Sequence, residues 1–440
     1  MKYIRIIITS LIFLLILISS YGLYKNFYIN TKYKSVVFHD NIHFDFQFLR
    51  TLSLSVCQMA DINECFATAR QIESGNFESW YDQWYATAQR IHTTATQALE
   101  NGHTISAQSA FLRASNYYRT SEFYLHSNPH DPRIREASQK SHICFTQAIA
   151  LMKPYIIPVK IPYESTTLPG YFYMVDNKKR PTIIMQTGLD GTQEELYCYA
   201  QEAIKRGYHV LTFEGPGQGY VLREQGIPFR PDWEVVIRSV VDFIITRTEV
   251  DSSQLILYGL SLGGYLTPRG ASGDNRIKIL ITNGGFYDLV AAQATFEGTT
   301  KNAFIEDIKK NEITFDQTIQ KKMKSNLAIK FFFEHGMFSF DAKTPSELML
   351  KCAAYTLENH AHLIKSITLI VDAEKEKPVF QGQAQHIYNH LTCPKTYMLF
   401  TDSEAAGFHC QIGALLFSTQ RIFDWLDQTL AATSSKISLN

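Results

Sequence analysis

Leu255-Ile256-Leu257-Tyr258-Gly259-Leu260-Ser261-Leu262-Gly263-Gly264 is the stretch of the sequence that decides the fold. Its first four residues are apolar and predict a short buried strand, whereas the residues from Ser261 onward predict a helix. Glycines stand two positions before and two positions after the serine, where a sharp strand-to-helix turn has no room for side chains. Such a turn lifts the serine hydroxyl out of the sheet and places it at a helix N-terminus. We therefore interpret Ser261 as a nucleophile rather than as a structural turn residue.

Short apolar segments alternate with helical segments on both sides of this turn, which predicts a mostly parallel sheet with helices on both faces. Strands are expected at 156–163, 170–175, 182–185, 209–213, 255–258, 279–281, 367–371 and 396–400, and helices at 194–206, 233–247, from 261 onward and at 420–430. Residues 155–433 therefore form the predicted catalytic domain. The charged, helix-prone stretch 291–363 interrupts it, which we interpret as a solvated helical insertion, with part of a lid as the alternative.

Residues 45–152 predict a separate helical domain. Apolar and aromatic residues recur there at three- and four-residue spacing, and Asn101-Gly102 and the segment 128–132 break the run into individual helices. Two interpretations of the aromatic residues Trp80 and Tyr118 stay open. They either fill the helical core or cover a substrate pocket.

The N-terminal residues 1–30 have a different character. After Lys2 and Arg5 the chain runs from Ile6 to Tyr24 without a charge, which is long enough for a membrane helix. A cleaved signal peptide also fits, with Ser20-Tyr21-Gly22 as its best cleavage site. We favour an uncleaved membrane anchor, and either alternative places the body of the protein outside the cytoplasm, on the periplasmic side of a bacterial-type cell. The flanking lysines do not settle the orientation.

Composition excludes some classes of partner. The 440 residues carry 42 Lys+Arg and 42 Asp+Glu, so a nucleic-acid partner is not expected. The seven cysteines have neither zinc-site spacing nor an even number, which argues against a metal site and against a disulfide framework. We expect most of them to be buried thiols, and we expect no cofactor.

A serine nucleophile needs a general base, which in this type of fold follows the serine in the chain and lies beyond the last strand. His409, in the segment Ala406-Gly407-Phe408-His409-Cys410, has that position. The other histidines downstream of Ser261 fall in helix-like stretches and are weaker candidates; they include His360, His362, His386 and His390.

The acid that orients the histidine should follow the strand at 367–371. Asp372, Glu374 and Glu376 all stand there. We favour Glu376, because the acid usually comes a few residues after the strand and directly before a loop with a proline, and a glutamate can still orient an imidazole. Asp372 and Glu374 remain alternatives.

The oxyanion of the reaction needs backbone donors. One is the N–H of Leu262, and the second is expected from Leu189 or Asp190, in the loop Gln186-Thr187-Gly188-Leu189-Asp190-Gly191-Thr192. The Asp190 carboxylate either faces the substrate or caps the following helix. The segment from Phe213 to Gly219 has G-x-G-x-G spacing with a proline in the turn, which predicts a tight loop rather than a nucleotide site.

Many further segments resemble one branch of the α/β hydrolases, in which a helical domain precedes the hydrolase core. This branch includes 2,6-dihydroxypseudooxynicotine hydrolase and fungal polyketide-shortening pyrone hydrolases. The similarity runs from about Asn76 to Asp427 and is carried by segments such as Glu78-Ser79-Trp80, Asp131-Pro132-Arg133, Leu168-Pro169-Gly170-Tyr171, Phe229-Arg230-Pro231-Asp232-Trp233-Glu234 and Phe423-Asp424-Trp425-Leu426.

The resemblance implies an α/β-hydrolase fold, a Ser–acid–His triad acting on a carbonyl substrate, and a helical domain that covers the active site and helps to form a homodimer. It also implies that Asp190 lies near the substrate, where a relative has a glutamate. We expect Tyr287, Trp80 and Tyr118 to contact substrate as well. Relatives commonly have aspartate at the acid position, so Glu376 departs from the pattern.

Three functions follow from these observations. Hydrolysis of an ester or thioester is our first hypothesis. Hydrolysis of a carbon–carbon bond in a 1,3-dicarbonyl or aryl ketone is the alternative that some relatives suggest. The third is a membrane-tethered protein that binds a partner without catalysis.

Overall fold

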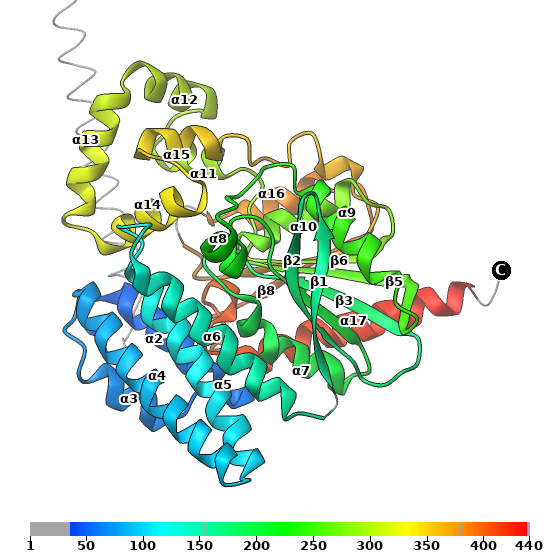
Figure 1. Ribbon diagram of the computed structural model, residues 1–440. Helices are drawn as coiled ribbons and strands as arrows, with labels where there is room; N and C mark the ends of the chain where they lie inside the picture. The colour runs from blue at the N-terminus through cyan, green and yellow to red at the C-terminus, as the bar shows by residue number, and fades with distance from the viewer. Residues whose placement is uncertain (1–35, 154, 378–379, 438–440) are drawn as a thin grey trace, which may run out of the picture.

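The computed structural model describes residues 36–153, 155–377 and 380–437. A helical domain leads into a sheet of eight strands, and a second group of helices interrupts the sheet domain between its sixth and seventh strands. Figure 1 shows the first helices in blue and cyan beside the sheet, and the inserted helices in olive and yellow above them. The predicted segment 1–30 lies outside the described residues.

The strand order is β1-β2-β4-β3-β5-β6-β7-β8. β1 and β2 form an antiparallel hairpin, β2 pairs antiparallel with β4, and the remaining neighbours are parallel. This is the α/β-hydrolase fold. The strands are β1 Ile156–Tyr163, β2 Thr166–Tyr173, β3 Arg180–Gln186, β4 His209–Phe213, β5 Val250–Leu260, β6 Ile277–Asn283, β7 Ile367–Ala373 and β8 Lys395–Phe400.

Helices cover both faces of the sheet (Figure 1). They are α7 Tyr197–Lys205, α8 Gly219–Gln225, α9 Trp233–Ile244, α10 Gly263–Ser272, α16 Gln383–His390 and α17 Leu415–Ile437. Alternate residues of β5 belong to different cores: Ile256 and Tyr258 pack with α7 and α17, whereas Leu255 and Leu257 pack with α9 and α10. Strands buried on both faces explain why the sequence showed continuous apolar runs rather than alternation.

The helical domain contains α2 Ile42–Ser53, α3 Ile62–Ala69, α4 Phe77–Glu100, α5 Thr104–Ser121 and α6 Pro132–Ala150. α4 ends at Glu100, with Asn101 as its C-cap before Gly102, whose φ is +75°, and α6 begins with Pro132 after the Asp131 cap. These are the two positions where the sequence predicted breaks. The interior of this domain belongs to the same hydrophobic cluster as one face of the sheet.

The inserted helices, which we call the lid, are α11 Leu289–Phe296, α12 Lys301–Lys310, α13 Glu312–Met323, α14 Leu327–Ser339 and α15 Pro345–Cys352. α14 packs on the helical domain, where Phe331 stacks on Phe123 at 4.6 Å between ring centroids. The lid therefore contacts both other parts of the molecule. Within the three described ranges no helix is long and apolar enough to cross a membrane.

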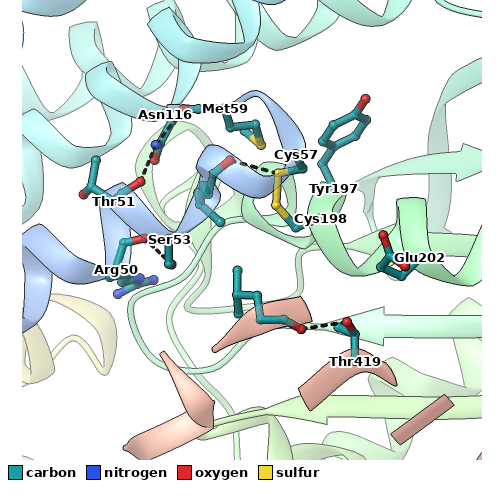
Figure 2. The surroundings of a disulfide bond; sticks show 12 residues. Arg50, Thr51, Ser53, Cys57, Met59, Asn116, Tyr197, Cys198, Glu202 and Thr419 are labelled. Carbon is teal, nitrogen blue, oxygen red and sulfur yellow. Dashed lines mark hydrogen bonds between the residues drawn. A yellow bond between two sulfur atoms is a disulfide. The ribbon is translucent and has the colours of Figure 1, made fainter. Parts of the chain in front are cut away.

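A disulfide joins Cys57 to Cys198, across 141 residues of sequence (Figure 2). Cys57 ends the short helix η1 Leu54–Cys57 of the helical domain, and Cys198 lies in α7 beside the sheet. The expectation of unpaired thiols was wrong for these two residues, because nothing in their local sequence reveals a partner so far along the chain. The free cysteines of the described residues are Cys65, Cys144, Cys352, Cys393 and Cys410, and all but Cys393 are buried.

Candidate active site

Ser261 stands in the turn between β5 and α10, with a φ of +60°. This left-handed conformation is strained for a residue with a side chain and is typical of a functional turn. The Ser261 N–H donates to the Asn283 carbonyl at 2.8 Å, which anchors the turn to β6. A Cβ on Gly259 would lie 2.1 Å from the Gly263 carbonyl oxygen, so a side chain does not fit at this position, two residues before the serine.

His409 follows β8 and begins the short helix η6 His409–Gln411. Its Nε2 lies 2.9 Å from Ser261 Oγ. A pair of hydrogen bonds between the side-chain amides of Gln411 and Asn283, at 2.7 and 3.2 Å, ties this loop to the end of β6. The same asparagine therefore fixes the backbone of the serine turn and the loop of the histidine.

Three carboxylates follow β7, and only Glu376 reaches the histidine. Its carboxylate lies 2.7 Å from Nδ1 of His409. Asp372 instead accepts a hydrogen bond from Tyr397 Oη at 2.5 Å, and Glu374 accepts one from the Asp402 N–H at 2.5 Å. The structure thus brings together Ser261, His409 and Glu376, the three residues that sequence reasoning favoured.

The histidine and its carboxylate are both buried, with 6% and 4% of their surface exposed. Burial by itself lowers the pKa of His409, but the neighbouring Cys410 sulfur and the negative charge of Glu376 outweigh it and raise the pKa above the ordinary 6.5. The Phe380 ring stacks on the imidazole at 5.9 Å between centroids and shields it further. The arrangement can take a proton from Ser261 Oγ and stabilise the resulting imidazolium.

The loop after β3 approaches the serine turn closely. A Cβ on Gly188 would lie 2.6 Å from the Leu262 nitrogen and 2.8 Å from Ser261 Cβ, so only glycine fits there. Gln218 Nε2 donates to the carbonyls of Thr187 and Gly188, at 2.8 and 3.0 Å. Within the described part of the chain, the N–H groups of Leu262, Leu189 and Asp190 have no hydrogen-bond acceptor. These are the three donors that the sequence suggested for an oxyanion.

Asp190 does not cap the helix that follows it. Thr192 is the cap, in a capping box with Glu195. The Asp190 carboxylate pairs instead with Arg50 of α2, at 2.9 Å, and Arg50 also pairs with Glu195 at 2.8 Å. Burial alone would raise the pKa of Asp190, but Arg50 lowers it strongly, so the carboxylate is ionised. Asp190 thus links the loop 187–192 after β3, which we call the oxyanion loop, to the helical domain.

The aromatic residues expected to contact substrate have three different environments. Trp80 is fully buried inside the helical domain, where its Nε1 donates to the Thr120 carbonyl at 2.8 Å. Tyr118 is also buried, with its hydroxyl 3.3 Å from His92 Nδ1. Tyr287 stacks on His390 of α16 at 4.4 Å between centroids. For Trp80 and Tyr118 these positions agree with the interpretation as helical core, and contact of the three residues with substrate stays a prediction.

Sequence reasoning missed Arg50, Gln218 and His335, which hold the oxyanion loop from three different segments. His335 Nε2 lies 2.9 Å from the Leu189 carbonyl oxygen. Arg50 and His335 stand in no motif, and Gln218 lies in the segment from Phe213 to Gly219, whose spacing indicated only a tight loop. In the described ranges, no group of three or more His, Cys, Asp or Glu residues could hold a metal ion.

Comparison with known proteins places this geometry in a family. Residues 54–366 match the family described as "Esterase FrsA-like". The chain belongs to the FrsA-like esterase family. Hydrolase acrC of Aspergillus aculeatus is 32% identical, over 89% of this chain and 97% of its own length. The 20-hydroxy-prefusarin hydrolase FUS2 of Gibberella moniliformis is 34% identical, over 88% of this chain and 96% of its own length.

A solved structure, that of 2,6-dihydroxy-pseudo-oxynicotine hydrolase, has the same fold. It superposes with a TM-score of 0.69 and 19% sequence identity, and covers 87% of this chain and 96% of its own. This FrsA-like chain is therefore an α/β hydrolase whose similarity to known structures includes the helical domain as well as the sheet. The resemblance found in the sequence motifs is confirmed.

Proposed function

We propose that this FrsA-like protein hydrolyses an ester or thioester, with Ser261 as nucleophile, His409 as general base and Glu376 as the acid that orients it. The observation that carries the proposal is the continuous contact from Ser261 Oγ through the imidazole to the carboxylate, at 2.9 and 2.7 Å. A buried chain of this kind is what a serine needs to be nucleophilic near neutral pH.

In the proposed reaction Ser261 Oγ attacks the substrate carbonyl carbon while His409 Nε2 takes the hydroxyl proton. The negative charge on the carbonyl oxygen is stabilised by the Leu262 N–H and by the N–H of Leu189 or Asp190. Collapse of this intermediate expels the alcohol or thiol, which receives the proton from His409. Water, activated by the same histidine, then releases the acid and restores the serine.

Labelling with a fluorophosphonate tests the nucleophile directly. Wild-type protein should form a covalent adduct at Ser261, and Ser261→Ala should not label. Ser272→Ala, a change at the end of α10 far along the helix from the turn, is the matched control and should label like wild type. Absence of labelling in folded wild-type protein would instead favour the non-catalytic, membrane-tethered binding protein.

Cleavage of a carbon–carbon bond is the second candidate. It is supported by the fold similarity to 2,6-dihydroxy-pseudo-oxynicotine hydrolase over nearly its whole length, helical domain included. The same residues serve, but the leaving group is a carbanion, and the proton held by His409 goes to carbon. A panel of p-nitrophenyl esters and 1,3-diketones separates the candidates, because turnover of esters without turnover of diketones contradicts the second.

We further propose that the described part of the protein lies outside the cytoplasm, anchored through residues 1–30. The Cys57–Cys198 disulfide supports this location, because disulfides persist in oxidising compartments. Blocking free thiols in intact cells before extraction tests it. Peptide mass analysis should find Cys57 and Cys198 unblocked, and two blocked cysteines would contradict the proposal.

A further inference from the structure

A row of buried side chains ends on the oxyanion loop and does not belong to the triad. His335 Nε2 lies 2.9 Å from the Leu189 carbonyl oxygen, and its Nδ1 lies 2.8 Å from Nδ1 of His126. On its other side, His126 Nε2 lies 2.8 Å from the Glu122 carboxylate, which also pairs with Arg223 at 2.5 Å. We call these four residues, Arg223, Glu122, His126 and His335, the histidine chain.

The histidine chain connects every part of the molecule. His335 lies in the lid helix α14, Glu122 and His126 lie between α5 and α6 of the helical domain, and Arg223 lies in α8 of the sheet domain. His335 is 1% exposed and His126 3% exposed. Burial alone would raise the pKa of Glu122, but Arg223 and His126 lower it to about 2, so this end of the chain is an anion. Water cannot substitute readily for contacts this deeply buried.

The chemistry of the last contact fixes its direction. A carbonyl oxygen can only accept, so Nε2 of His335 carries the hydrogen and donates it to Leu189. In a neutral ring Nδ1 then accepts, and the Nδ1–H of His126 is its donor. Nε2 of His126 faces the Glu122 carboxylate, which only accepts, so Nε2 also carries a hydrogen and His126 pairs with Glu122 as an imidazolium. His126 and the residues beyond it therefore determine both the tautomer and the orientation of His335.

The carbonyl of Leu189 shares a peptide unit with the N–H of Asp190. The two groups of a trans peptide point in opposite directions, so the donor that holds the carbonyl sets the direction of the N–H. The preceding peptide is held in the same way, because Gln218 donates to the Gly188 carbonyl and thereby directs the Leu189 N–H. Both candidate oxyanion donors thus belong to peptides that a buried side chain holds from behind.

We propose that His335 is a positioning residue for the oxyanion donors, and that the histidine chain makes a competent oxyanion site dependent on correct docking of the lid on the helical domain. This inference rests on the proposed serine-hydrolase function. His335 touches neither Ser261 nor His409, so its loss should weaken stabilisation of the transition state and leave substrate binding nearly unchanged.

The test compares His335→Phe, which keeps ring volume but has no N–H, with His335→Gln, which keeps a donor. Ser339→Ala is the matched control, because Ser339 is buried in the same helix and its hydroxyl makes no hydrogen bond within the described residues. For each variant, kcat and KM are measured with a p-nitrophenyl ester. The inhibition constant of an aryl boronic acid, whose adduct places an oxygen anion in the oxyanion site, is measured alongside.

We expect His335→Phe to lower kcat by about 10- to 100-fold, somewhat less than removal of an oxyanion donor itself. KM should change less than about threefold, and boronic acid affinity should fall by the same factor as kcat. His335→Gln should restore most of both, and Ser339→Ala should equal wild type. His126→Phe, which removes only the support of His335, should show the same pattern with a smaller loss and covers the case in which His335→Phe does not fold.

Two results would overturn the inference. One is wild-type kcat and boronic acid affinity in folded His335→Phe and His126→Phe. The other is an equal loss in kcat, KM and thermal stability that glutamine does not restore, since that is the signature of a purely structural residue. Failure of the proposed function is distinguishable, because it would appear as wild-type protein that forms no fluorophosphonate adduct at Ser261.

Discussion

At the scale of single residues, the choice of Glu376 as the acid depends on where β7 ends. The strand continues to Ala373, so Asp372 is still part of the sheet and pairs with Tyr397 of the neighbouring strand. Glu374 turns back to the Asp402 N–H in the loop after β8. Only the third carboxylate lies far enough along the loop to face His409, and the additional methylene of glutamate provides the reach.

Replacing each carboxylate in turn tests this assignment. Glu376→Gln should lower kcat by about 10³- to 10⁴-fold, because the imidazole loses the charge that holds its tautomer and stabilises its cation. Asp372→Asn and Glu374→Gln are the matched controls and should stay within about tenfold of wild type. The measurement is ester hydrolysis by folded, purified variants. A larger loss in Asp372→Asn than in Glu376→Gln would contradict the assignment.

The pH dependence of the reaction should reflect the raised pKa of His409. The histidine must be neutral to take the serine proton, so kcat/KM should increase with pH, through a pKa above 6.5. In Glu376→Gln this acidic limb should move to lower pH, because the imidazolium has lost its negative neighbour. Profiles of kcat/KM between pH 5 and pH 10 check both statements. An acidic limb at or below 6.5 in wild type would count against them.

The sequence predicted a site residue wherever the residues next to it in the chain indicate its role. Ser261 is surrounded by the glycines that its strained φ requires, and His409 follows the last strand. The acid was left among three residues, because one-residue differences in strand length decide which carboxylate faces the histidine. Arg50, Gln218 and His335 could not be predicted, because each acts on the loop after β3 from a distant segment.

At the scale of elements, the loop after β3 and the turn after β5 form one unit. Gly188 lies against both Ser261 and Leu262, and Gln218 and His335 hold the loop from behind. The strands were predicted well because both faces are apolar, and their ends differ from expectation by a few residues. The apolar spacing in α4 matches the face of that helix that is buried, whereas α5 is buried on nearly every side, which its spacing did not indicate.

Gly188→Ala should uncouple this unit without unfolding the protein. The added Cβ would lie 2.6 Å from the Leu262 nitrogen, so the loop must move away from the oxyanion site. We expect kcat to fall by at least about 100-fold, in the range that loss of an oxyanion donor produces. Circular dichroism and kinetics together provide the measurement.

The control for this change is Gly226→Ala, where φ is +67° and nothing lies within 4 Å of the added Cβ. It carries a backbone penalty of about 1 kcal/mol but is remote from the loop, so kcat should be unchanged. Near-normal turnover in Gly188→Ala would mean that this loop does not supply an oxyanion donor.

At the scale of the whole molecule, three of the attachments of the helical domain bear on the site. The Cys57–Cys198 disulfide is covalent, the Arg50 ion pairs reach the oxyanion loop, and the histidine chain runs through the lid. The disulfide was not foreseen, since only the fold brings two cysteines 141 residues apart within a Cα–Cα distance of 5.4 Å. The active site is thus bordered by segments from every part of the sequence that the structure describes.

Removing the disulfide should destabilise the protein. The double change Cys57→Ser and Cys198→Ser frees a long loop in the unfolded chain and should lower the free energy of unfolding by about 2–5 kcal/mol. Thermal or urea unfolding measures the difference, and Cys393→Ser, which removes a free thiol, is the control. Equal stability of the double variant and this control would show that the cross-link adds nothing to the other attachments.

The hydrophobic cluster shared by the helical domain and one face of the sheet has a consequence for protein engineering. Chimeras are usually made by exchanging parts of related genes at a domain boundary, which here would be the junction between α6 and β1. Such a crossover would cut through one continuous core and mismatch Phe145 with Tyr171, whose rings lie 4.8 Å apart across the junction. Exchange of the lid between β6 and β7 divides less of this core but cuts the second cluster, in which Leu289, Phe340 and Leu348 pack with the other face of the sheet. A productive chimera should therefore carry over, with either part, the residues of the sheet face that it covers.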